Sequence, residues 1–302
     1  MRYSFNFLKP NIIHTHRQKE NVVASIANLT SVRCACLRTV HGASEFSYSW
    51  HELDHLVQNC ADWLCGFFLQ DKLIAVSKDL ENEMRRSFPS RKLVTIENGV
   101  DFELLLNKPM ESVFSSFEEA LHIGIVGRLV PVKRIDMFLR MAQRLLVSEG
   151  FVGRVRFHII GGGPLSESMQ MMSRNLGLSE HVSFHGHVND VPSYLKSLDV
   201  LVMCSDHEGL PMTLLEAMVI GTPIVSHHCG ALKDALHHRH GGVLTAKHSR
   251  ESYASSVKNL LEDEECRSEL VASGKLLAGT TYSAARNAQR VCDLYEKLAG
   301  GN

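Results

Sequence analysis

The chain has 302 residues, of which 44% are hydrophobic and 22% are charged. These proportions are typical of a soluble globular protein, and the length favours two domains at roughly 150 residues each. Lys and Arg total 32 against 33 Asp and Glu, so the chain lacks the basic excess that is typical of nucleic-acid-binding proteins. No apolar run approaches the roughly 18 residues of a membrane span, and Met1–Pro10 lacks the apolar core of a secretory signal. We therefore expect a cytoplasmic protein that does not bind nucleic acid.

Short apolar runs alternate with longer helical patterns along the chain. Many of these runs are β-branched and bounded by Gly, Asn or Asp, which predicts strands. Alternation of strands with helices is typical of βαβ units, and therefore of an α/β fold with parallel sheets. The predicted strands are Asn11–His14, Cys34–Val40, Lys72–Val76, Leu93–Ile96, His122–Val126, Val155–Ile160, Val182–Phe184, Val200–Met203, Pro223–Ser226 and Gly242–Leu244.

Two helical patterns and one gap between strands indicate the domain organisation. Lys133–Ser148 carries apolar residues at a spacing of three to four, which gives one buried face, and Ser283–Leu298 is amphipathic. Leu104–Glu119 contains no clean strand, and we interpret it as the link between two domains.

A strand, a loop and a helix that carry two carboxylates form the most informative segment. Glu208 follows the buried strand Val200–Met203, in the loop at the carboxyl end of that strand. Pro211 suits the first turn of a helix, which we predict to begin at Leu210 or Pro211. The free N–H groups and the positive dipole end of that helix suit an anion. Glu216 lies in the same helix, and two carboxylates near a phosphate-binding helix end suit a sugar nucleotide. Taken separately, Glu208 is also consistent with an exposed loop acid and Glu216 with an ordinary helix acid.

A second segment of the same kind carries two cations. Arg128 leaves the predicted strand His122–Val126, and Lys133 opens the next predicted helix. Because the helix dipole disfavours cations at this end, their presence indicates an anionic ligand. Arginine can fork onto phosphate oxygens and lysine can act as a point charge, so the pair matches a diphosphate. In isolation the same pair is also consistent with two solvated basic residues.

The order and spacing of these motifs resemble those of the retaining glycosyltransferases of family four. The matching motifs are Gly127-Arg128-Leu129 with Lys133, Gly161–Pro164, Phe184–Gly186, and Glu208–Pro211 through Glu216. The resemblance implies the GT-B fold, in which two Rossmann-like parallel-sheet domains face a cleft. It implies a partial N-terminal, acceptor-side domain at 1–105, a nucleotide-sugar-binding domain at 118–280, and a final helix at 281–302 that crosses back to the first domain.

The resemblance also implies a role for each matching residue. Arg128 and Lys133 would hold the donor diphosphate. Glu208 would contact hydroxyls of the transferred sugar, and Glu216 would hold the ribose. His41 ends a predicted strand and would lie near the sugar and the β-phosphate, so the catalytic set is His41, Glu208, Arg128 and Lys133. The other donor-binding positions would be Gly186 and Val188 near the base, and Gly209, Leu210, Pro211, Met212 and Thr213 at the sugar and phosphates.

The implied activity is transfer of a sugar from a nucleotide-sugar donor, most commonly a UDP-sugar, with GDP and ADP as other donor bases. The donor is a substrate, and the family requires neither a metal nor another cofactor. The acceptor would be a glycan or a lipid-linked molecule, in polysaccharide or lipopolysaccharide biosynthesis, with peripheral contact at the inner face of a membrane. The histidine-rich stretch 237–240 is interpreted as a surface loop rather than a metal site, because no carboxylate or Cys is spaced with it as in a recurrent zinc motif.

The first domain is shorter than the family pattern, which normally places two or three βα units before the segment matched by Ile13–Arg17. We therefore expect the start of this domain to be missing, with an exposed sheet edge through which the chain could self-associate. An alternative function is a non-catalytic nucleotide-sugar-binding remnant, or one half of a complex. A dinucleotide oxidoreductase is disfavoured, because Gly161–Ser166 lacks the last glycine of that fingerprint.

Overall fold

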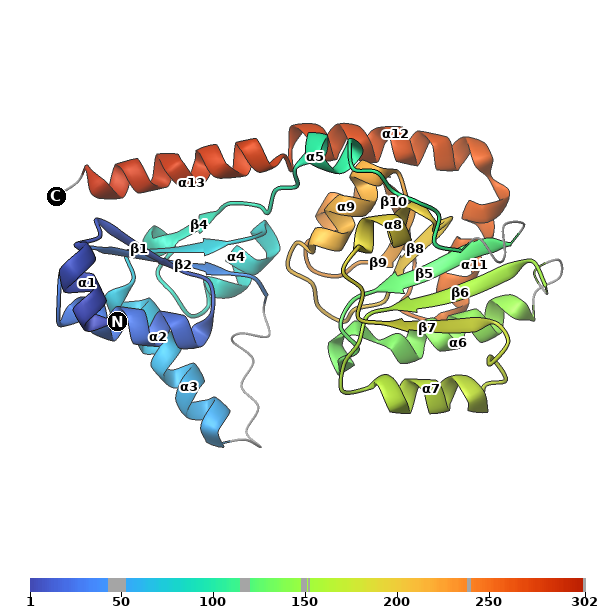
Figure 1. The fold of residues 1–302 in the computed structure, drawn as a ribbon, viewed down its shortest axis with the longest axis horizontal. Coiled ribbons are helices and arrows are strands. Elements are labelled where there is room, and N and C mark those ends of the chain that lie inside the picture. The colour runs from blue at the N-terminus through green and yellow to red at the C-terminus, as the bar shows by residue number, and fades with distance from the viewer. Residues whose placement is uncertain (43–52, 115–119, 148–150, 152, 238–239, 301–302) are drawn as a thin grey trace. The chain divides into compact units, whose positions relative to one another are not determined.

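The computed structural model describes residues 1–42, 53–114, 120–147, 151, 153–237 and 240–300. Contacts divide the chain into two compact units (Figure 1). The first unit comprises residues 1–98, 208–210 and 285–302, and the second comprises 99–207 and 211–284. Each unit is built around a parallel sheet, which confirms the predicted α/β class. The predicted domain boundaries at 105, 118 and 280 stay predictions.

The sheet of the first unit has its four strands in chain order, β1-β2-β3-β4. The strands are β1 (Ile12–Thr15), β2 (Ala35–Val40), β3 (Lys72–Ala75) and β4 (Leu93–Thr95). The connecting helices are α2 (Gln18–Leu29), α3 (Leu53–Leu64) with its extension η2 (Cys65–Leu69), and α4 (Lys78–Met84), and α1 (Arg2–Leu8) precedes the sheet. The predicted strands of this half differ from the observed ones by no more than one residue at either end.

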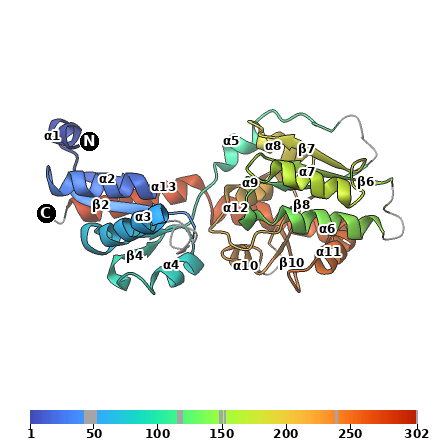
Figure 2. The same ribbon diagram turned by 90° about the horizontal axis from the view of Figure 1, so that it is seen from below.

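One face of this sheet is covered by the final helix, α13 (Ala284–Ala299), and the other by α2 and α3 (Figures 1 and 2). Leu294 of α13 is buried against Leu37 and Ile74 of the sheet. Asn287 Nδ2 donates a hydrogen bond of 2.6 Å to the backbone oxygen of Glu97. The amphipathic pattern thus predicts α13 to within one residue at each end, and its apolar face completes the core of the first unit.

A buried ion pair anchors β2 from the other face. Arg38 is fully buried and pairs with Asp62 of α3, and Asn21 Nδ2 donates to Asp62 Oδ1 at 2.8 Å. Removing one partner of such a pair typically costs about 3–5 kcal/mol, because the remaining charge is left buried and unpaired. The pair therefore fixes the strand that leads to His41.

The sheet of the second unit has six parallel strands in the order β10-β9-β8-β5-β6-β7. The strands are β5 (Leu121–Val126), β6 (Val155–Ile160), β7 (Val182–Gly186), β8 (Val200–Met203), β9 (Ile224–His227) and β10 (Gly242–Thr245). Chain order reverses between β5 and β8, which are hydrogen-bonded neighbours. In open parallel sheets, ligands bind outside the carboxyl ends of the strands at such a switch point.

Two layers of helices cover this sheet (Figures 1 and 2). One layer contains α6 (Ile135–Leu146), α7 (Ser166–Asn175) and α11 (Arg250–Glu262). The other contains α5 (Phe102–Leu106), α8 (Val191–Lys196), α9 (Met212–Ile220) and α12 (Glu264–Thr280), and the short helix α10 (Leu232–Ala235) follows β9. The core lies mainly between the sheet and the first layer, where Phe138 and Phe157 are fully buried.

The predicted helix Lys133–Ser148 starts two residues too early. Pro131–Lys133 form a 3-10 turn instead, and Arg134 has a left-handed backbone conformation with φ 49°. Because that conformation interrupts the helix, α6 begins at Ile135.

The segment that we interpreted as a linker, Leu104–Glu119, contains no strand as far as residue 114, and 115–119 lie outside the described residues. It includes the end of α5. Phe114 stacks on His158 with ring centroids 3.8 Å apart, and Lys108 forms an ion pair of 2.6 Å with Asp190. These contacts attach the segment to the second unit. In the part of the chain that the structure describes, no helix is both long enough and apolar enough to cross a membrane.

Three histidines on neighbouring strands form a hydrogen-bonded row beneath Phe114. His122 Nδ1 lies 2.9 Å from His158 Nε2, and His158 Nδ1 lies 3.0 Å from His185 Nε2. Burial, followed by the nearby charges of His122 and His185, lowers the pKa of His158 from 6.5 to about 3. His158 is therefore neutral in the folded protein at neutral pH.

We expect the free energy of unfolding to fall as the pH is lowered from 6.5 towards 3. The folded-state pKa of His158 lies below its unfolded value of 6.5, so the unfolded chain binds more protons in this window. At pH 5 the loss attributable to His158 should be about 2 kcal/mol, since each pH unit is worth about 1.4 kcal/mol. Urea unfolding at pH 7.5 and 5.0 measures it, with His158→Gln as the comparison. An equal pH dependence in both proteins would contradict the assignment.

Candidate functional site

Two loops lie side by side in the second unit: the loop that carries the two cations and the loop that leads into the helix with Glu216. The loop after β5 carries Arg128 and Lys133, and the loop after β8 leads into α9. Because β5 and β8 are neighbouring parallel strands, both loops emerge at the same edge of the sheet, at the switch point. The structure therefore places these two motifs next to each other, although they are about 80 residues apart in the sequence.

Lys133 folds back over the end of β5. A Cβ atom added to Gly127 would lie 3.3 Å from Lys133 Cε and 3.8 Å from Nζ. The side chain of Arg128 is exposed, whereas that of Lys133 is half-buried. Both cations thus lie at the carboxyl edge of the sheet. We predicted that Lys133 opens the helix, but it ends the 3-10 turn that precedes α6.

Backbone contacts join the loop after β5 to the glycine-rich loop after β6. Leu129 N donates to Gly162 O at 3.0 Å, and Leu165 N donates to Leu129 O at 3.1 Å. A Cβ atom at Gly163 would lie 2.5 Å from Leu129 O, and one at Gly161 would lie 2.0 Å from Gly127 O. No side chain fits at either position, so the glycines are required for this close approach of two backbones.

The first turn of α9 presents uncapped backbone N–H groups. The helix begins at Met212, with Pro211 as its N-cap in an extended conformation and no side chain that caps it. The predicted start at Leu210 or Pro211 was therefore one or two residues early. The predicted binding positions Pro211, Met212 and Thr213 all lie at this end, where the dipole and free N–H groups favour an anion.

Glu216 lies one turn into α9 and is half-buried. Burial raises the pKa of its carboxyl group, and the charge of Lys108 opposes that effect. A carboxylate in this position gains from hydrogen-bond donors that replace the water it has lost.

The remaining predicted positions of the second unit follow β7. Gly186 ends that strand with φ 66° and is exposed, and Val188 is half-buried two residues later. Gly161 N donates to Gly186 O at 2.8 Å, which ties this end to the glycine-rich loop.

His41 follows β2 in the first unit, in a group of histidines. His16 Nδ1 lies 3.2 Å from His41 Nε2. His14 Nδ1 lies 2.6 Å from the hydroxyl of Tyr295, and His14 Nε2 lies 2.8 Å from that of Thr39. Burial, with the nearby charges of His16 and His41, lowers the pKa of His14 to about 4, so it is neutral at neutral pH. A cavity of 310 Å³ opens beside these rings, between the sheet and α13.

The predicted site residues are thus divided between the two units. His41, Glu208, Gly209 and Leu210 belong to the first unit by their contacts, with Glu208 and Gly209 half-buried. The second unit contains Arg128, Lys133, Gly186, Val188, Pro211, Met212, Thr213 and Glu216 at one edge of its sheet.

Sequence reasoning missed Tyr295, Lys108, Arg134 and Asp206. Their roles depend on contacts between distant positions, for which the sequence holds no local signal. No group of three or more His, Cys, Asp or Glu side chains is placed to hold a metal ion within the described ranges. In the histidine-rich stretch 237–240, residues 238 and 239 lie outside those ranges.

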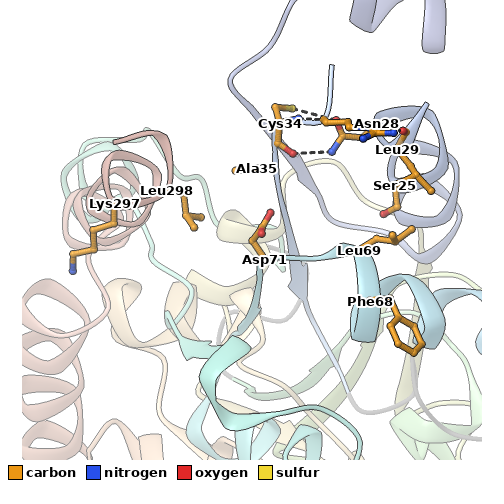
Figure 3. Close-up of a pocket in the computed structure, with 11 residues that line it drawn as sticks. Ser25, Asn28, Leu29, Cys34, Ala35, Phe68, Leu69, Asp71, Lys297 and Leu298 are labelled. Carbon is orange, nitrogen blue, oxygen red and sulfur yellow. Dashed lines mark hydrogen bonds between the residues drawn. The ribbon is translucent and has the colours of Figure 1, made fainter. Parts of the chain in front are cut away.

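A separate cavity of 610 Å³ lies at the opposite edge of the first sheet, where β2 and β3 begin (Figure 3). Asp71, Phe68 and Lys297 are among the side chains around it (Figure 3). None of the predicted site residues lines this cavity.

Two family models match the chain. The model described as "Glycosyl transferases group 1" matches residues 110–276, which is more than half of the chain. The model described as "Glycosyltransferase Family 4" matches residues 2–104.

Individual proteins also resemble the chain over half of its length or more. An Escherichia coli protein described as UDP-Gal:alpha-D-GlcNAc-diphosphoundecaprenol alpha-1,3-galactosyltransferase is 24% identical to this chain. The match covers 95% of this chain and 75% of that protein. A Campylobacter jejuni N-acetyl-D-galactosaminyltransferase, whose described acceptor is linked to diphosphate-undecaprenol, is 31% identical over 53% of this chain and 44% of its own. The crystal structure of Anabaena HepE in complex with UDP matches with a TM-score of 0.82 and 17% identity, over 98% of this chain and 81% of that one.

We expect Gly163→Ala to destabilise the protein by about 1–3 kcal/mol, because the new methyl group would overlap Leu129 O. Gly162→Ala is the matched control, since its added Cβ would lie 3.6 Å from the nearest atom. Urea unfolding measures both, and equal stabilities of the two variants would contradict the close approach of the loops.

Proposed function

Since this chain belongs to the glycosyl transferases group 1 family, we propose that it transfers a sugar from a UDP-sugar donor to a glycan or lipid-linked acceptor, with retention of the anomeric configuration. The observation that carries the proposal is the pairing of Arg128 and Lys133 with the uncapped start of α9 at the switch point of the second sheet. Two cations and a set of free N–H groups at one sheet edge form a binding site for a diphosphate.

In this proposal the second unit binds the donor. Arg128 and Lys133 neutralise the diphosphate, and the backbone N–H groups of Met212 and Thr213, which follow the N-cap Pro211, donate to its oxygens. Glu216 accepts hydrogen bonds from the ribose hydroxyls, which would compensate the burial that raises its pKa. Gly186 and Val188, at the end of β7, lie on the base side. The HepE structure, which contains UDP, supports uracil as the base.

The same groups supply the proposed catalysis. As the bond between the anomeric carbon and the diphosphate oxygen breaks, negative charge grows on the leaving group, and Arg128 and Lys133 stabilise it. The acceptor oxygen bonds to the anomeric carbon on the same face, and its proton passes to the departing phosphate oxygen. Glu208 holds the hydroxyls of the sugar, and His41 contacts the sugar beside the β-phosphate. Because the cations neutralise the charge, we propose that the reaction needs no metal.

The acceptor class rests on the relatives. The described acceptors of the E. coli and C. jejuni proteins are linked to diphosphate-undecaprenol. We therefore propose a lipid-linked saccharide as the first acceptor to test.

We expect purified protein to bind UDP more tightly than GDP or ADP in calorimetric titrations. Arg128→Ala and Glu216→Ala should each weaken UDP binding by about tenfold or more, because each removes a hydrogen bond to or from a charged group. Arg140→Ala, which removes an exposed arginine on α6, is the control and should leave the affinity unchanged. Absence of binding to all three nucleotides, or UDP binding that neither substitution weakens, would refute the donor site.

Transfer is tested separately by release of UDP from UDP-galactose and UDP-glucose in the presence of a diphosphate-linked N-acetylhexosamine lipid. We expect turnover that EDTA does not abolish and an α-linked product, detected by NMR. UDP binding without any transfer would favour the second candidate, a protein that binds nucleotide sugars and acts only with a partner.

A further inference from the structure

We propose that Arg134 is a positioning residue, which holds the loops after β5 and β8 together through Asp206. Neither residue belongs to the donor-binding set, and the inference rests on the proposed donor site. We call this contact the Arg134–Asp206 bridge. Arg134 Nη1 lies 3.0 Å from Asp206 Oδ1, and both side chains are partly exposed, at 30% and 46%.

The backbone of Arg134 is strained. Its φ of 49° and ψ of 48° are left-handed, a conformation that residues other than glycine, Asn and Asp rarely adopt. Strained residues persist where surrounding interactions determine their conformation, and they concentrate at functional sites. Glycine would occupy this position without strain, so an arginine here indicates that its side chain is used.

The side chain of Arg134 is held on both sides. Its Nε and Nη2 atoms form a fork on Asp136, at 3.0 and 3.1 Å, while Nη1 faces Asp206. Burial of Asp136 disfavours its charged form, but the hydrogen bonds and charge of Arg134 outweigh that effect and lower its pKa. The fork fixes the plane of the guanidinium group, so its free edge has one direction in which to bind a carboxylate.

Asp206 joins the bridge to the ends of the other strands. Its backbone N donates to Val132 O at 2.9 Å, and His248 Nδ1 lies 3.7 Å from its Oδ1. The ring of His248 stacks on His227, with centroids 3.9 Å apart. Val132 follows β5, Asp206 follows β8, His227 ends β9 and His248 follows β10, so the contacts connect the carboxyl ends of four strands.

The bridge lies next to both motifs of the donor site along the chain. Arg134 directly follows Lys133, and Asp206 precedes Glu208 by two residues. The bridge therefore sets the relative position of the loop with the diphosphate cations and the loop with the sugar carboxylate. Small errors in the placement of binding groups weaken binding and catalysis strongly.

Hydrogen exchange of the ligand-free protein tests the bridge without reference to nucleotide binding. Arg134→Gly removes the side chain and relieves the left-handed backbone, which offsets part of the loss of its hydrogen bonds to Asp136, so the variant should remain folded. We expect amide exchange over residues 204–210 to become about tenfold faster, because the loop loses its side-chain anchor. Arg33→Gly is the matched control, since Arg33 is exposed and has a φ of 53° at the opposite edge of the first sheet. Unchanged exchange over 204–210 in Arg134→Gly would overturn the proposal.

Calorimetry then separates positioning from direct contact with phosphate. Arg134→Gly and Asp206→Asn should each weaken UDP binding by about tenfold. Because both substitutions break the same contact, the double variant should have about the same affinity for UDP as the single variant with the lower affinity. Binding of UMP, which lacks the β-phosphate, should change less. If Arg134 bound phosphate directly, loss of the Asp206 charge would leave UDP binding unchanged or strengthen it, and that outcome would overturn the positioning role. If the unsubstituted protein bound no nucleotide, the donor assignment would fail, and the exchange experiment would still decide the bridge.

Discussion

The carboxyl edge of the second sheet, where the proposed donor site lies, depends on a close approach between two backbones. Leu129 and the glycine-rich loop exchange hydrogen bonds of 3.0 and 3.1 Å, and this geometry leaves no room for a side chain at Gly163. Because backbone hydrogen bonds hold this loop, its position does not depend on the rotamers of its side chains. Arg128 and Lys133, on either side of Leu129, therefore start from a fixed backbone.

Much of this arrangement could be predicted from local sequence. Short apolar runs rich in β-branched residues located the parallel strands, because a buried strand such as Val200–Met203 has an apolar side chain at each position. Motif spacing predicted the positions that reach one edge, because every parallel strand of a βαβ series ends at the same side. The errors were small: helix starts were predicted one or two residues too early, and several strand ends differ by one or two residues. The left-handed conformation of Arg134 delays α6, and no pattern of hydrophobic residues reports a single backbone angle.

Contacts between distant side chains could not be predicted in this way. The pairing of Arg134 with Asp206 requires the strand order, since it joins loops that are adjacent only because chain order reverses between β5 and β8. Lys108 moderates the effect of burial on Glu216 from a segment that the sequence presented as a linker. In both cases the residue types are ordinary, and the interactions they make come from the neighbours that the fold provides.

The position of α13 has a consequence for the order of folding. Leu294 fills the core beside Leu37, and Tyr295 bonds to His14, across a separation of 281 residues. During synthesis the whole second unit leaves the ribosome before these residues do, and domains fold largely in the order in which they emerge. Until then, one face of the first sheet is uncovered and exposes its apolar side chains to solvent. Of the two units, the first is thus begun earlier and completed later, once α13 has been synthesised.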